Sequence, residues 1–90
     1  MPTSASAKKR VRQSEVRRLR NRSVRSNLRT HIKNCVKAIE AGDLETAQST
    51  FRTMESRMDS AARKGVIHKN TASRRKSRLA RRLHALASAG

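Results

Sequence analysis

The chain has 90 residues, of which 34% are hydrophobic, and 23 lysines and arginines oppose six acids to give a net charge of +17. Three glycines, one proline and a single aromatic ring, Phe51, exclude the many turns of an all-β domain and an aromatic core. We therefore expect one small all-α domain with an aliphatic core, and a polyanionic partner that balances the charge.

The cationic side chains are concentrated toward the two ends of the sequence. Residues 1–30 hold ten cations and one acid, residues 31–65 six cations and five acids, and residues 66–90 seven cations and no acid. Two basic segments therefore flank a segment that is nearly neutral.

The first predicted helix runs from about Lys8 to Ala41, after a flexible tail over residues 1–7, and a single domain spans residues 8–90. The second half of this helix carries an apolar stripe, formed by Leu28, Ile32, Cys35, Val36 and Ile39. Continued upstream at about 3.6 residues per turn, the stripe meets Arg25, Asn21, Arg18, Arg17 and Ser14. The first half therefore has no apolar face for packing on other helices.

The first helix is also too long for its neighbours. At about 1.5 Å per residue it would measure about 50 Å, against roughly 30 Å for the next helix, so about 20 residues should overhang. This overhang is basic on every side, and alone in water it is expected to fray. It needs an anionic partner around it.

Gly42 and Asp43 predict the end of the first helix and the N-cap of the second. The second helix should end near Lys64, before Gly65, and its core-facing seam is Leu44, Ala47, Phe51, Met54, Met58 and Ala61. The third helix is capped by Asn70 or Thr71, or begins a turn earlier, and its seam is Ala72, Leu79, Leu83 and Leu86. Short connections predict an up-down-up three-helix bundle with a long basic first helix overhanging it.

The residue inventory does not suit an enzyme or a metal site. The glycines are isolated, and the three histidines stand far from one another and from the lone Cys35. Cys35 is expected to be a small buried hydrophobe, and a single cysteine fits a reducing compartment. We predict no enzymatic activity, no cofactor, no metal and no small-molecule substrate.

Membrane and targeting functions are also disfavoured. No apolar run approaches the ~20 residues of a membrane span, and the strongest apolar seam lies in the least basic helix. The beginning of the chain has the Arg- and Ser-rich character of an organelle transit peptide, but the basic character continues without a cleavage-like break. We expect no membrane partner.

The segment VIHKNTASRRKSRLARRL (residues 66–83) holds seven cations and no acid, whereas a solvated helix face normally interleaves Lys and Arg with Glu. Phosphate binding explains this composition. The side opposite the seam holds Asn70, Arg74, Ser77, Arg78 and Arg81, with Arg75 and Arg82 on the flanks. Phe51 is the one aromatic ring, so the chain lacks the aromatic platforms of single-strand stacking modules. The helix before Gly65 is long for a helix-turn-helix. Two binding partners fit these basic segments. One is folded RNA with a crevice between its helices, and the other is a DNA duplex.

The segment RKGVIHKNTASRRKSRLARRL, with SAKKRVRQ near the start and RSNLRTHIKN in the first helix, closely resembles the family of ribosomal protein S twenty of the bacterial small subunit. The match covers essentially the whole chain. The resemblance implies a three-helix structural protein that binds and stabilises small-subunit ribosomal RNA during assembly. Its expected place is the cytoplasmic small ribosomal subunit, beside other ribosomal components, touching the RNA 5′ domain and the long penultimate helix near the 3′ end.

Carried over by position, the resemblance implies two RNA-contact segments, from Lys8 to Arg29 and from His68 to Arg82. The predicted RNA-binding residues are Lys8, Lys9, Arg10, Arg12, Arg17, Arg18, Arg22, Arg25, Arg29, His68, Lys69, Asn70, Arg74, Arg75, Ser77, Arg78, Arg81 and Arg82. The alternative function is that of a DNA-compacting basic helical protein.

Overall fold

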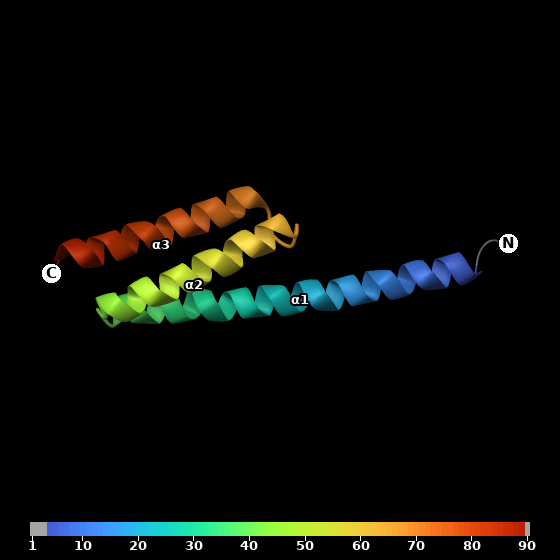
Figure 1. The fold of residues 1–90 in the computed structure, drawn as a ribbon, viewed down its shortest axis with the longest axis horizontal. Helices are drawn as coiled ribbons and strands as arrows, with labels where there is room; N and C mark the ends of the chain where they lie inside the picture. Colours follow the sequence, from blue (N-terminus) through green and yellow to red (C-terminus); the bar gives the residue numbers. More distant parts are fainter. Residues whose placement is uncertain (1–3, 90) are drawn as a thin grey trace.

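A computed structural model describes residues 4–89 as three α-helices: α1 covers Ser4–Glu40, α2 Leu44–Arg63 and α3 Lys69–Ala89. The helices alternate in direction, and α2 lies between α1 and α3 (Figure 1). The all-α, up-down-up prediction is therefore confirmed. α1 begins at Ser4, earlier than the expected start near Lys8, and the rest of the predicted tail lies outside the described residues.

The corner between α1 and α2 is closed by backbone hydrogen bonds that need a glycine. Gly42 has a φ of 75°, and its N–H donates to the carbonyl of Ile39 over 3.1 Å, while the N–H of Asp43 donates to the carbonyl of Ala38 over 3.1 Å. This pair of bonds is the Schellman arrangement, which satisfies the last carbonyls of a helix. Asp43 then caps α2, because its carboxylate accepts from the N–H of Thr46 at 3.2 Å and from its hydroxyl at 2.7 Å. Both predictions for this corner are confirmed.

The corner between α2 and α3 begins in the same way. Gly65, at a φ of 76°, donates to Ala62, and Val66 donates to Ala61 and packs its side chain on the core. α3 begins at Lys69, so the earlier start left open by the sequence is observed, and neither Asn70 nor Thr71 is the cap. The Nδ1 atom of His68 accepts the N–H of Asn70 at 3.1 Å, so an imidazole takes the place of the usual hydroxyl or carboxylate.

The hydrophobic core is small and centred on α2. Its main cluster combines Leu28 of α1 with Met54, Met58 and Ala61 of α2 and with Ala72 and Leu79 of α3. Cys35, Ala38 and Ala47 are buried as well, so the predicted seams are largely confirmed.

Phe51 differs from the expectation of a core residue. It is half-buried and packs against the edge of the cluster, whereas Met54 and Met58 are fully enclosed. Phe51 belongs to the first half of α2, and its side chain is partly covered there. α2 packs more extensively on α1 than on α3, and α1 and α3 touch little. The cover over Phe51 is therefore incomplete.

The first half of α1 extends past the other two helices, as predicted (Figure 1). Residues 6–20 are exposed throughout, and the first half-buried side chains are those of Asn21 and Val24. The molecule is consequently 69 Å long but only 20 Å and 14 Å across. We call residues 4–20 the arm. It is helical in the structure although no tertiary packing supports it.

We expect Met54→Ala to lower the free energy of unfolding by about 2–5 kcal/mol, because it leaves a cavity at the centre of the core. Leu19→Ala in the arm is the matched control and should change it by less than about 0.5 kcal/mol, since this side chain is 60% exposed. Urea unfolding followed by circular dichroism measures both. Equal losses would contradict the position of the core.

We expect the thiol of Cys35 to be unreactive in the folded protein. Desolvation by burial raises the pKa of Cys35, against smaller lowering effects of a hydrogen bond with Thr50 and of the charge of Arg82. A raised pKa favours the neutral thiol on folding, so this stability is present below the unfolded pKa of about 8.5 and is lost as pH rises through the folded value.

Labelling with an aromatic disulfide reagent should therefore follow unfolding. The difference in stability between the wild type and Cys35→Ala should shrink as pH rises above about 8.5. Rapid stoichiometric labelling of the native protein, or a pH-independent difference, would show that Cys35 is not buried.

Candidate nucleic-acid interface

α3 turns one side to the core and the opposite side outward. Ala72 and Leu79 are buried, and Leu83 and Leu86 are half-buried on the same side. At about 100° per residue, the outward side holds the predicted set opposite this seam. All of these residues are exposed, and we call them the α3 face: Asn70, Arg74, Ser77, Arg78 and Arg81.

Acidic partners for the cations of α3 are few. Lys76 Nζ lies 2.7 Å from Asp59 Oδ1, and this hydrogen bond raises the pKa of Lys76. Arg82 Nη2 lies 3.9 Å from Glu40 Oε1, a loose and exposed pair of little stabilising effect. These are the two ion pairs found within residues 4–89. The arginines of the α3 face therefore meet no carboxylate inside the described part of the protein.

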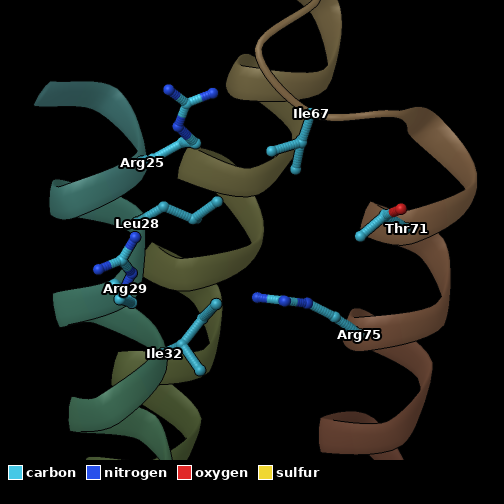
Figure 2. A pocket seen from close by; sticks show the side chains of 7 residues that line it. All are labelled: Arg25, Leu28, Arg29, Ile32, Ile67, Thr71 and Arg75. Carbon is cyan, nitrogen blue, oxygen red and sulfur yellow. The ribbon is translucent and has the colours of Figure 1, made fainter. Parts of the chain in front are cut away.

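A groove of about 150 Å³ lies between α1 and α3. It unites three predicted site residues from the two ends of the chain, Arg25 and Arg29 of α1 and Arg75 of α3. In Figure 2 the side chain of Arg75 extends from α3 across the groove toward Ile32. The remaining lining residues are Leu28, Ile32, Ile67 and Thr71.

The chemistry of this α1–α3 groove favours an anion. The lining includes three guanidinium groups and no carboxylate, so each arginine raises the electrostatic cost of the others. A guanidinium offers a planar fork of donors that matches the oxygens of a phosphate. A phosphate in the groove would therefore be bound by donors from two helices and would relieve the repulsion between them.

The arm carries the second set of predicted residues. Its exposed cations are Lys8, Lys9, Arg10, Arg12, Arg17, Arg18 and Arg20, and Glu15 is the one acid among them. Arg20 was not among the predicted residues, although its exposure equals that of its neighbours. The arm leads away from α3, the helix that carries the α3 face (Figure 1). Most of the predicted residues therefore lie in the arm, in the α1–α3 groove or on the α3 face. Arg22 is exposed just after the arm.

Three of the predicted residues have other surroundings. His68 accepts the hydrogen bond that begins α3, which is a structural role. Lys69 does not join the α1–α3 groove, because it lies between α2 and α3 near Asp59 and Lys76. Arg82 faces the C-terminal end of α1 through Glu40. These three are therefore less free to turn toward a ligand than the arginines of the α3 face.

The residues that the structure describes also bear on metal binding and on membrane insertion. No group of three or more His, Cys, Asp and Glu side chains lies close enough to hold a metal ion within residues 4–89. No helix in this range is both long enough and apolar enough to cross a bilayer.

Comparison with known proteins identifies the family. Residues 2–84 match the family model described as Ribosomal protein S20. The chain is similar to "Small ribosomal subunit protein bS20" of Pseudomonas aeruginosa, with 53% identity covering 99% of this chain and 98% of that protein. It is also similar to the proteins of that name from Acidithiobacillus ferrooxidans, 49% identical with the same coverage, and Thermomicrobium roseum, 54% identical over 99% of this chain and 90% of the relative. The chain therefore belongs to the ribosomal protein S20 family, a family of structural ribosomal proteins and not of enzymes.

Proposed function

We propose that this chain is an RNA-binding protein of the small ribosomal subunit, which binds small-subunit ribosomal RNA and stabilises its fold during assembly. The relatives are named as proteins of the small ribosomal subunit, and this supports the assignment. The observation that carries the proposal is the α3 face, whose arginines are exposed and lack acidic partners among the described residues. RNA phosphates supply the missing negative charge.

Binding would proceed by neutralisation of phosphates and release of their counterions. On the α3 face, arginines can bind phosphates through two donors each, and Asn70 and Ser77 can reach a phosphate, a ribose hydroxyl or a base edge. The α1–α3 groove is lined by Arg25 and Arg29 of α1 and by Arg75 of α3. The core fixes the distance between these helices, so the protein recognises an arrangement of phosphates and not a base sequence.

The arm supports RNA over duplex DNA as the partner. Its cations lie on all sides of a single helix, and no other part of the described chain covers them. A DNA duplex admits a helix into its major groove but leaves the outward side of that helix uncovered. A crevice between folded RNA helices surrounds the arm with phosphates, and this fits the arm better. The membership in a ribosomal protein family favours the same choice.

The first prediction tests the α3 face with Arg74→Gln combined with Arg78→Gln. The free protein should be as stable as the wild type, because both side chains are exposed and their removal relieves repulsion. The affinity for a transcript of bacterial small-subunit ribosomal RNA should fall, and the salt slope should become shallower by about one unit per lost phosphate contact. Filter binding at several salt concentrations measures both quantities.

The matched control is Arg52→Gln combined with Arg63→Gln, which removes the same charge from exposed positions of α2. It should reduce affinity much less. If the α3 variant bound the RNA like the wild type, or lost no more than the control, the α3 face would not be the contact surface. A stronger loss on random duplex DNA than on the ribosomal RNA would support the DNA-compacting alternative.

The second prediction concerns the arm, whose helix lacks tertiary support. In the free protein the amides from Arg12 to Arg22 should exchange almost as fast as in an unstructured peptide, since unsupported helices open easily. The amides around Met54 should be protected and serve as the internal control. Addition of ribosomal RNA should slow exchange in the arm strongly. Strong protection of the arm without RNA would show that the helix is stable by itself.

A further inference from the structure

A second groove lies between α1 and α2. None of the residues predicted individually to bind RNA lines it, although its α1 residues fall within the predicted contact segment from Lys8 to Arg29. It has a volume of about 230 Å³ and is lined by Ser23, Val24, Asn27, Arg57, Ser60, Ala61 and Lys64. We propose that this α1–α2 groove binds an RNA backbone. Arg57 and Lys64 would contact phosphates, and the Ser and Asn side chains would contact ribose hydroxyls. This inference rests on the proposed function and adds a contact surface to it.

The α1–α2 groove is separate from the basic groove between α1 and α3. Arg25 lines the α1–α3 groove and Asn27 lines the α1–α2 groove, and a separation of two residues places them about 160° apart around the helix. Leu28, between the two directions, enters the core. The two grooves therefore lie on opposite sides of the contact between α1 and α2.

Charge is segregated around α2 in a way that favours an anion in this groove. Arg57 and Asp59 are about 160° apart on the helix, and Asp59 is turned toward α3, where it binds Lys76. Arg57 and Lys64 are exposed, and neither belongs to the two ion pairs found within residues 4–89. No carboxylate lines the groove. The near-neutral composition of residues 31–65 conceals this separation.

The uncharged polar side chains of the groove suit a ribose. The hydroxyls of Thr46, Thr50 and Thr53 are engaged in hydrogen bonds within α2 and its cap. The hydrogen bonds found within residues 4–89 do not include the side chains of Ser23, Asn27 or Ser60 (compare the hydroxyl of Thr30, which bonds to Ser26). These three groups can donate and accept, as can the 2′-hydroxyl that distinguishes RNA from DNA.

The arm supports an RNA occupant of this groove over an acidic peptide. Arg20 near the end of the arm precedes Ser23 and Asn27 by three and seven residues, a spacing that places all three on one side of α1. A strand of RNA that follows the arm on this side therefore reaches the groove without a break in polar contacts. Val24 and Ala61 are the apolar residues of its lining.

The test compares two double variants that remove equal charge from α2. Arg57→Gln with Lys64→Gln should lower the affinity for a transcript of bacterial small-subunit ribosomal RNA at least about tenfold and make the salt slope shallower by about two units. Arg52→Gln with Arg63→Gln is the control, because these positions lie at least about 100° away from the first pair around the helix. Circular dichroism confirms that all variants remain helical.

The outcomes separate this inference from the proposed function. If the groove pair and the control pair lost the same affinity, only net charge would matter, and the groove assignment would be wrong. If the groove pair bound normally while Arg74→Gln with Arg78→Gln lost affinity, the groove assignment would fail and the proposed function would stand. If neither pair lost affinity, both would fail.

A charge-neutral variant tests the ribose contact. The triple substitution Ser23→Ala, Asn27→Ala and Ser60→Ala should weaken binding to the transcript severalfold without changing the salt slope, and the helices tolerate alanine well. Binding to duplex DNA should be unchanged, because DNA lacks the 2′-hydroxyl. An equal loss on DNA, or no loss on RNA, would overturn the ribose assignment.

Discussion

Mutual repulsion among the cationic side chains is the constraint on which the other features of this structure depend. The chain carries a net charge of +17, and the described residues form two ion pairs, one of which is loose. Such repulsion opposes compaction. The protein responds by keeping its cations on the outside of a thin, elongated molecule and by burying a few aliphatic side chains. Its charge balance is completed by an RNA partner in our proposal.

The three helices contribute unequally to the core and to the charge. α2 supplies four of the nine buried hydrophobic side chains, more than either neighbour, and contacts both of them, whereas α1 and α3 carry most of the charge. Two Schellman corners and the Asp43 cap set the helix ends by local hydrogen bonds. The small core then holds the two grooves and the α3 face in a fixed relation, which is what recognition of folded RNA requires.

Much of this arrangement follows from local chemistry and could be predicted. Gly42 and Gly65 end helices because they adopt positive φ angles, and the seam of α2 follows from its periodicity. The overhang follows from the loss of the apolar stripe of α1 at Arg25. The exposed arginines of α3 follow from its seam.

Other features depend on how the helices meet, and they could not be predicted. Phe51 lies at the edge of the core, and how far a seam residue is covered depends on the packing of the neighbouring helices. The hydrogen bond by which the His68 side chain caps α3 depends on local geometry and cannot be inferred from the residue type. Arg29 and Arg75 line one groove and Asn27 and Arg57 line another, and these groupings become visible only in the tertiary structure.

The most direct test of the account is a salt titration of wild-type binding to a transcript of bacterial small-subunit ribosomal RNA. If about 6–10 phosphates are neutralised, the affinity should fall roughly 10³–10⁵-fold between 50 and 200 mM salt, and a nearly flat titration would contradict recognition by charge.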